Sequence, residues 1–176
     1  MKSKILRRNA AYQKQVEALL ERLAASDDSV LNMSAMDGGW SAIQTAHHLI
    51  LTEELSLKYV QKKLSFQPKL EVPGPDSWFR SNLLALYLYL PFKFKAPDAV
   101  GDQSLPGFTS LADTRARWLK IRQDWTDFLE QLPNELLDKS VYRHPFAGRF
   151  GWPGMLRFFQ NHFTRHQKQI FRTLGY

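Results

Sequence analysis

Apolar residues recur at steps of three and four along most of the chain, which is the spacing of one face of an α-helix. Between Lys4 and Ala25 charged residues lie opposite this face, which is made by Tyr12, Val16, Leu19, Leu20 and Leu23. The pattern predicts an amphipathic helix over these residues. The turn-forming run Ser26-Asp27-Asp28-Ser29 is predicted to end it.

A second, longer helix is predicted to begin after Ser41, a residue type that caps helix starts, and to end before Pro68. It carries two adjacent histidines, His47 and His48. Ile43, Ile50, Leu57 and Leu64 share a face with His47, whereas Gln44, Leu51, Leu55 and Tyr59 share one with His48. A helix that is apolar on both sides is buried, so periodicity does not choose between the two histidines.

The middle of the chain is richer in proline. Residues 67–77 are predicted to connect the second helix to the apolar segment Trp78–Leu90. Alternating Tyr87 and Tyr89 would also suit a strand, but the lack of any other convincing strand favours a helix. Residues 92–108 contain several prolines and glycines and are predicted to form a long loop.

Two further helices complete the pattern. Ser110 followed by Asp113 marks the start of a helix that runs to about Leu132. Its expected buried face consists of Leu111, Trp118, Ile121, Trp125, Phe128 and Leu132. Residues 141–150 are predicted to be a turn-rich connector, and Trp152-Pro153 begins the last helix with proline in its favoured first turn. We expect one all-α domain over residues 1–176, a four-helix bundle with an additional short helix.

Composition narrows the kinds of site that the chain can build. With 176 residues, 44% of them hydrophobic, the chain can bury a core of ordinary size. It has no cysteine, which excludes disulfides, thiolate zinc sites and a cysteine nucleophile. Any metal ligands must therefore be His, Asp, Glu or water.

The N-terminus and the longest apolar run indicate neither a signal peptide nor a membrane span. The basic N-terminus lacks the apolar core of a signal peptide. The longest apolar run, Leu83–Leu90, is far shorter than the about 20 residues that span a bilayer. We therefore expect a cytoplasmic protein without a membrane-spanning segment.

The chain is basic, with a formal net charge of +7 and a pI near 9.7. Its 24 lysines and arginines are spread along the sequence instead of forming a block. Solvated basic faces explain this distribution best, followed by a preference for an anionic small substrate. No motif that reads a nucleic-acid groove is present, so we do not expect nucleic-acid binding.

The last helix contains the candidate chemistry, because His162 and His166 stand four residues apart and so lie on one helix face. They lie on or beside an apolar stripe formed by Met155, Phe159, Phe163, Ile170 and Leu174. A buried imidazole needs a hydrogen-bond partner or a metal ion. The pair alone leaves both interpretations open: two hydrogen-bonded core histidines, or part of a metal site.

Three features taken together resemble the DinB-like superfamily of metal-binding four-helix bundles. They are Trp40-Ser41 followed by His48-Leu49, the turn His144-Pro145-Phe146-Ala147-Gly148, and His162 followed by His166 and Gln169-Ile170. The resemblance covers nearly the whole chain and depends on the order and spacing of these motifs. Many relatives carry His-Arg-Gly-Gln where this chain has His166-Gln167-Lys168-Gln169, a departure that affects the substrate pocket rather than the metal site.

The resemblance implies that His48, His162 and His166 are three metal ligands at the mouth of the bundle. Three neutral imidazoles leave a coordination position for water or substrate, as catalytic sites do. A metal there lowers the pKa of a bound water or thiol toward neutrality. Imidazole suits several metals, so the divalent ion could be zinc, nickel, iron or manganese. His47 is expected to pack nearby or to support the site, and it stays the alternative to His48.

Other polar residues receive supporting roles. His144 is expected to fix its turn, and Gln169 is expected to hydrogen-bond within the bundle. Glu53 and Glu54 could bond a ligand imidazole or face solvent. Three arginines, Arg143, Arg149 and Arg165, are either candidates for binding a substrate carboxylate or simply solvated.

For function, the resemblance implies a metal-dependent transferase or hydrolase that activates a low-molecular-weight thiol or water and acts on a small molecule. Characterised relatives of this kind include S-transferases that use bacillithiol or mycothiol and a thiol-dependent isomerase. The alternative is a non-catalytic binding or stress-response module with the same fold. Such a module could form a homodimer through the aromatic-rich segment Trp78–Phe94.

Overall fold

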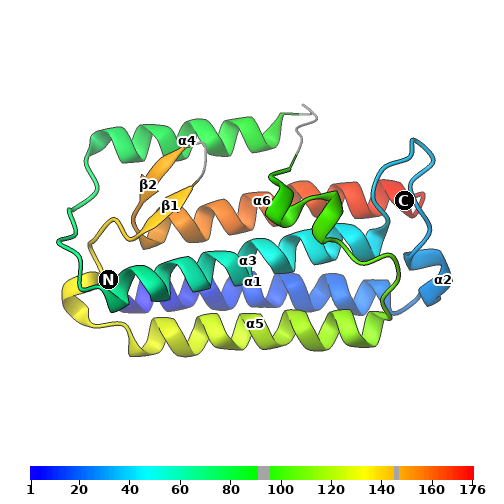
Figure 1. Cartoon of the computed structure of the whole chain (residues 1–176), viewed down its shortest axis with the longest axis horizontal. Coiled ribbons are helices and arrows are strands. Elements are labelled where there is room, and N and C mark those ends of the chain that lie inside the picture. The colour runs from blue at the N-terminus through cyan, green and yellow to red at the C-terminus, as the bar shows by residue number, and fades with distance from the viewer. Residues whose placement is uncertain (91–95, 145–146) are drawn as a thin grey trace.

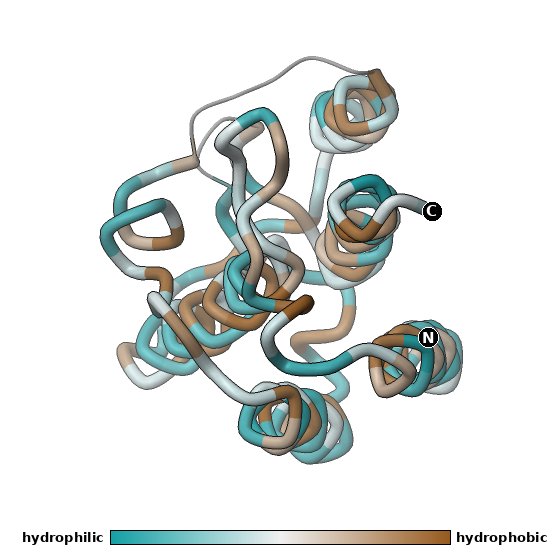
Figure 2. The backbone as a smooth tube through the Cα atoms, turned by 90° about the vertical axis from the view of Figure 1, so that its right-hand side faces the viewer, coloured by the Kyte–Doolittle hydropathy of each residue, from teal (hydrophilic) through white to brown (hydrophobic). Residues whose placement is uncertain are grey.

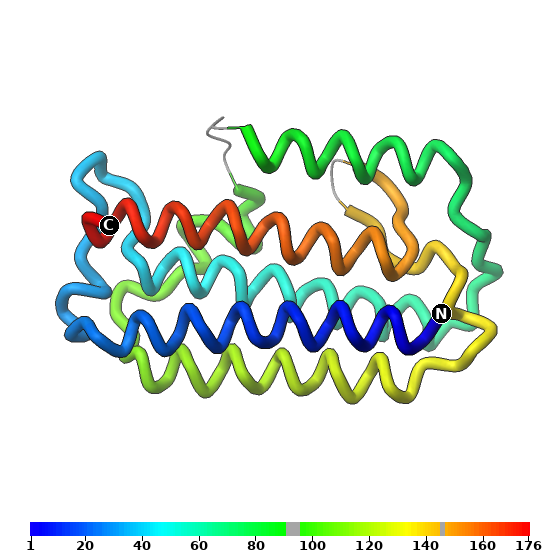
Figure 3. The backbone as a smooth tube through the Cα atoms, turned by 180° about the vertical axis from the view of Figure 1, so that it is seen from behind, coloured from blue at the N-terminus to red at the C-terminus, as the bar shows by residue number. Residues whose placement is uncertain are grey.

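The computed structural model describes residues 1–90, 96–144 and 147–176. Four long helices form the bundle: α1 (Lys2–Leu23), α3 (Ala42–Ser65), α5 (Leu111–Gln131) and α6 (Trp152–Thr173). Helix α1 packs against α5 and α6, and α3 packs against the same two helices (Figures 1 and 3). The expected all-α four-helix bundle is thereby confirmed.

The additional helix is α4 (Pro75–Tyr89), which confirms the helical interpretation of the apolar segment with alternating tyrosines. Shorter elements are α2 (Asp28–Leu31) and three 3-10 helices, η1 (Asp98–Val100), η2 (Asp102–Ser104) and η3 (Asn134–Leu136). Of the loop expected at residues 92–108, positions 92–95 lie outside the described residues. The rest contains η1 and η2.

The segment expected to be only a connector instead contains a β-hairpin. Strand β1 (Tyr142–His144) pairs antiparallel with β2 (Gly148–Phe150), and Tyr142 lies opposite Phe150. Each strand has three residues, which is too short for an alternating pattern to appear in the sequence. Pro145 and Phe146 of the quoted turn lie outside the described residues.

Side-chain caps start two of the bundle helices as the sequence predicts. The Ser41 hydroxyl accepts from the Gln44 N–H at 3.1 Å, and the Gln44 side chain accepts from the Ser41 N–H at 3.1 Å. This reciprocal pair is a capping box, which satisfies two backbone donors that the first turn leaves free. Ser110 caps α5 by accepting from the Asp113 N–H at 3.0 Å.

The core is aromatic and continuous through the bundle. All five residues named for the first helix are buried, as are Trp118, Ile121, Trp125 and Leu132 of α5. Leu111 and Phe128 are only partly buried and pack on the edge of this core. The largest inaccessible side chains include Trp118, Trp125 and Trp152.

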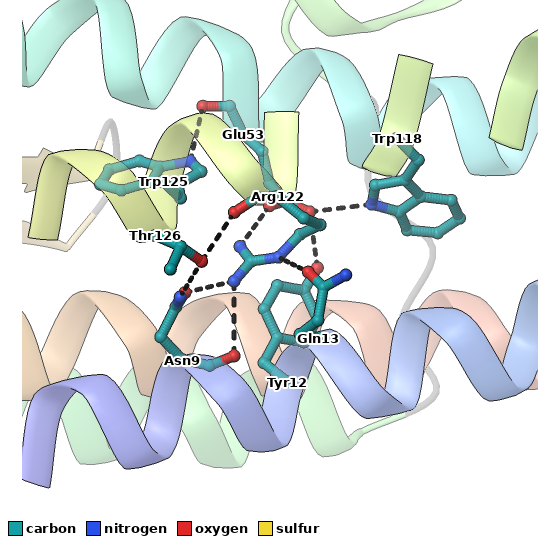
Figure 4. A network of polar contacts seen from close by, with 8 residues as sticks. All are labelled: Asn9, Tyr12, Gln13, Glu53, Trp118, Arg122, Trp125 and Thr126. Carbon is teal, nitrogen blue, oxygen red and sulfur yellow. Dashed lines mark hydrogen bonds and ion pairs between the residues drawn. The ribbon is translucent and has the colours of Figure 1, made fainter. Parts of the chain in front are cut away.

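A polar network crosses the middle of this core (Figure 4). The Glu53 carboxylate of α3 accepts hydrogen bonds from Tyr12 Oη–H at 2.7 Å, Trp118 Nε1–H at 3.0 Å and the Arg122 guanidinium at 2.7 Å. Arg122 of α5 also donates to the side chain of Asn9 on α1. The Arg122 and Glu53 side chains are only 0% and 2% exposed, so each is the other's main charge compensation.

Helix α4 lies on the outside of the bundle, beside α6 and β2 (Figures 1 and 2). Arg157 of α6 donates to the side chains of Ser81 and Asn82. Near the other end, Arg165 donates to the carbonyls of Leu88 and Leu90 at 3.2 and 2.6 Å. Among the described residues, none of the helices is both long and apolar enough to cross a membrane.

Candidate metal centre

Two helices that are far apart in the sequence bring three histidines together. His48 lies in the first half of α3, and His162 and His166 lie one turn apart on α6. His162 Nε2 is 3.1 Å from the Nε2 atoms of both His48 and His166. All three nitrogens lie within 4.8 Å of one another. The three residues that the family resemblance singles out therefore share one site.

The outward nitrogens of two of these rings are held by oxygen acceptors. His48 Nδ1–H donates to the Val100 carbonyl of η1 at 2.7 Å, and His166 Nδ1–H donates to Gln169 Oε1 at 2.9 Å. These acceptors assign the proton of each neutral ring to Nδ1 and leave a lone pair on Nε2. Both lone pairs then face the middle of the cluster, as they do in metal-ligating histidines.

The cluster fits a metal ion better than it fits hydrogen bonding alone. His162 Nε2 can carry at most one proton, so at most one of its two 3.1 Å contacts can be a hydrogen bond. In tetrahedral coordination with metal–nitrogen distances of about 2.0–2.1 Å, neighbouring ligand nitrogens lie about 3.4 Å apart. The two 3.1 Å separations from His162 Nε2 are close to this value, and neutral imidazoles are ligands for several divalent ions.

Burial keeps these imidazoles neutral. Desolvation lowers the pKa of His48 and lowers the pKa of His166 to about 3. The pKa of His162 is well below its ordinary value, mainly through burial and then through His166 and His48. The cluster is thus in its metal-binding protonation state at neutral pH without any partner having to remove a proton.

Aromatic side chains surround the cluster. The Trp40 ring lies 5.0 Å from the His48 ring, and Trp40 Nε1–H donates to Asp102 at 2.5 Å. Phe158 stacks on His162, with ring centroids 5.2 Å apart. The edge of His144 in turn contacts Phe158. Trp40 and Phe158 thus pack directly against two of the three imidazoles.

The neighbouring His47 faces α5 and not the cluster. Arg117 donates to His47 Nδ1 at 3.2 Å, so the Nε2–H of the ring donates to Thr114 Oγ1 at 3.2 Å. Burial and then the Arg117 charge lower the pKa of His47 to about 4. Both ring nitrogens of His47 therefore have partners on α5, whereas His48 reaches the cluster.

The two glutamates after these histidines also turn toward α5. Glu53 belongs to the buried network with Arg122. Glu54 forms a bidentate ion pair with Arg117, whose Nε and Nη2 atoms donate to the two carboxylate oxygens at 2.8 and 2.7 Å. The idea that either carboxylate bonds a cluster imidazole is therefore wrong. The cluster imidazoles are instead hydrogen-bonded by the Val100 carbonyl and by Gln169.

Of the other singled-out residues, His144 and Arg165 have structural contacts. His144 Nδ1 accepts from the Ala147 N–H at 3.2 Å, which agrees with a role in fixing its turn. Arg165 holds the end of α4 through two carbonyls. Arg143 and Arg149 are exposed and lie opposite each other in the hairpin, where they remain available to an anion.

Sequence reasoning missed Val100 and Asp102, which fix His48 and Trp40. Val100 acts through its backbone carbonyl, a group that every residue has, so no residue-type pattern could reveal it. The involvement of Gln169 was visible as a polar residue one turn beyond His166, although its specific partner was not.

Comparison with known proteins supports the same family. The family model described as DinB superfamily matches residues 11–170. A solved structure, described as YfiT from Bacillus subtilis, a probable metal-dependent hydrolase with an unusual four-helix bundle topology, aligns with a TM-score of 0.58 at 19% sequence identity. The alignment covers 99% of this chain and 88% of that one. None of the curated proteins matches the chain.

Proposed function

The chain belongs to the DinB superfamily, and from that premise we propose that it is a metal-dependent enzyme whose divalent ion is held by His48, His162 and His166. The observation that carries this proposal is the convergence of three Nε2 atoms, two of them with lone pairs directed inward by Val100 and Gln169. Zinc, nickel, iron and manganese all suit such a set of ligands.

The proposed reaction is hydrolysis, or transfer of a low-molecular-weight thiol, on a small-molecule substrate. When bound, the metal would supply Lewis acidity and lower the pKa of a water or thiol that reaches it. The similarity to YfiT, described as a probable metal-dependent hydrolase, supports water as the first nucleophile to test and a thiol as the second. Exposed Arg143 and Arg149 could attract an anionic substrate to this side of the molecule, because their charges lie on the hairpin that contains His144.

Elemental analysis of protein purified without a histidine tag tests the proposal. We expect about one divalent ion per chain, and we expect His48→Ala, His162→Ala and His166→Ala each to weaken metal affinity by more than about 100-fold, since even second-sphere changes cost about 10–100-fold. His47→Ala is the matched control and should keep its metal, because His47 bonds Thr114 and Arg117. Folded wild-type protein that cannot be loaded with any of the four metals would overturn the proposal.

The second-sphere role of Gln169 gives a separate prediction. Gln169→Ala removes the acceptor that orients His166, so metal affinity should fall by about 10–100-fold while the helix stays folded. Gln167→Ala on the same helix is the matched control and should leave the affinity unchanged. Competition titrations with a metal-binding dye measure both values. Equal affinities in the two variants would show that Gln169 does not support the site.

A further inference from the structure

Helix α4 exposes a continuous apolar surface that the bundle does not use. We define the α4 patch as Trp78, Phe79, Leu83, Leu86 and Tyr89, which are 67%, 63%, 55%, 56% and 78% exposed. Phe79, Leu83 and Leu86 follow one another at steps of four and three, so they form one stripe along the helix. Trp78 and Tyr89 broaden this stripe on one side.

The opposite face of α4 is the one that packs on the protein. Its buried residues are Ser77, Ser81 and Leu84, two of which are small and polar. The Ser77 hydroxyl donates to the Arg149 carbonyl of β2, and Ser81 accepts from Arg157 of α6. The helix is therefore attached by hydrogen bonds on its inner side, while most of its large apolar side chains point outward. This arrangement is the reverse of an ordinary surface helix.

The area of the α4 patch is suited to a second copy of the chain. Phe, Tyr and Trp each contribute about 150–250 Å² when fully covered, and a leucine contributes less, so the exposed parts of these five amount to roughly 450 to 700 Å² per copy. Patches on monomers seldom exceed about 300–600 Å². Two copies meeting through the α4 patch would bury roughly 900 to 1,400 Å², which spans the threshold of about 1,000 Å² for a specific interface and reaches the lower part of the range of about 1,200–2,000 Å² for stable ones.

The charge pattern also favours self-association. Residues 81–90 contain no charged side chain, and Lys168 of α6 reaches the patch only at Tyr89, with its Nζ atom 5.3 Å from the centre of that ring. The stripe Phe79, Leu83 and Leu86 can therefore be covered without burying an ion from α4 itself. The charges at the start of the helix, Asp76 and Arg80, pair with each other at 2.6 Å. A membrane surface would instead be expected to meet an amphipathic helix rich in lysine and arginine, and Arg80 is the only basic residue of α4.

We propose that the α4 patch is the contact between two copies of this chain, related by a twofold axis that sets the two α4 helices against each other. In a twofold interface the same surface is used by both copies, so one apolar stripe is sufficient. The proposal is independent of whether the histidine cluster binds a metal. In such a dimer, the second copy covers an apolar surface of α4 that the bundle leaves exposed to water.

Sedimentation velocity at several protein concentrations tests this contact. Wild-type protein should sediment as a dimer of the 20.5 kDa chain. Phe79→Glu and Leu86→Glu, which place a charge in the interface, should each weaken dimerisation by at least about 100-fold and give monomers. The matched control is Phe108→Glu, because Phe108 is 65% exposed, close to the 63% of Phe79, but lies in the segment before α5. It should remain dimeric.

Two outcomes would overturn the proposal. One is a wild-type protein that is monomeric at every concentration, and the other is a dimer that survives both glutamate substitutions. Co-sedimentation with phosphatidylcholine vesicles separates the membrane alternative: monomeric protein that binds vesicles and loses binding in Phe79→Glu would assign the α4 patch to a lipid surface. Circular dichroism of each variant verifies that the helices are intact.

Discussion

Replacing Glu53 by alanine is expected to lower the free energy of unfolding by about 3–5 kcal/mol. The substitution would leave the Arg122 guanidinium charged in the core without its carboxylate, and that side chain is fully inaccessible. It would also remove the acceptor of the Tyr12 hydroxyl and the Trp118 indole N–H. Urea unfolding followed by circular dichroism measures the loss, which is a large part of the stability of an ordinary domain.

The adjacent Glu54 provides the control. It also pairs with an arginine of α5, Arg117, but this pair is partly exposed, with side chains 30% and 41% accessible. Glu54→Ala should therefore cost less than about 1 kcal/mol. Combining Glu53→Ala with Arg122→Met should cost less than the sum of the two single changes, because the second removes the stranded charge. Equal costs for Glu53→Ala and Glu54→Ala would contradict the assignment of Glu53 to a buried ion pair.

The metal-free protein is expected to lose stability steeply as the pH falls below about 6.5. Burial lowers the pKa of His144 to about 4 and of His166 to about 3 in the folded chain, whereas both titrate near 6.5 when unfolded. Between these values the unfolded chain binds more protons, so acid favours unfolding. Each such histidine contributes about 1.4 kcal/mol per pH unit within its window.

Urea unfolding in the presence of a chelator, between about pH 7 and pH 5, measures this dependence. His144→Asn is the informative variant, because an amide oxygen can accept the Ala147 N–H in place of Nδ1 but does not titrate. The free energy of unfolding of this variant should fall less steeply with acid than that of the wild type. The difference in slope should be the contribution of one histidine, about 1.4 kcal/mol per pH unit. Stability that is constant over this range would mean that the histidines are hydrated and not buried.

Much of the helical framework could be predicted from the sequence because its signals are local. The stripe of α1 and the caps Ser41 and Ser110 depend on residues within one or two turns of each other, and all were confirmed. The hairpin was missed because its strands have three residues each. Its pairing depends on contacts with Phe158 and Phe159 that only the folded bundle provides.

The buried network and the histidine cluster show where local patterns fail. Arg122 stands beside Ile121 in a helix whose apolar stripe was recognised, yet its burial requires Glu53 and Asn9 from two other helices. Periodicity could not choose between His47 and His48, because both sides of α3 are buried. In the folded chain, Thr114 and Arg117 of α5 hydrogen-bond both ring nitrogens of His47, which leaves His48 as the histidine that reaches the cluster. Metal binding by the cluster remains a prediction.

The cluster also has a consequence for the unfolded chain. His48 and His162 are 114 residues apart, and the chain has no cysteine with which to form a disulfide. An ion held by both histidines would act as a reversible cross-link that closes most of the sequence into one loop. In the chain-entropy model of cross-links, closing a loop of about 100 residues raises the free energy of the unfolded chain by about 4–5 kcal/mol. Loading the ion would thus close a cross-link between the second and the last long helix, and removing the ion would open it, without any redox chemistry.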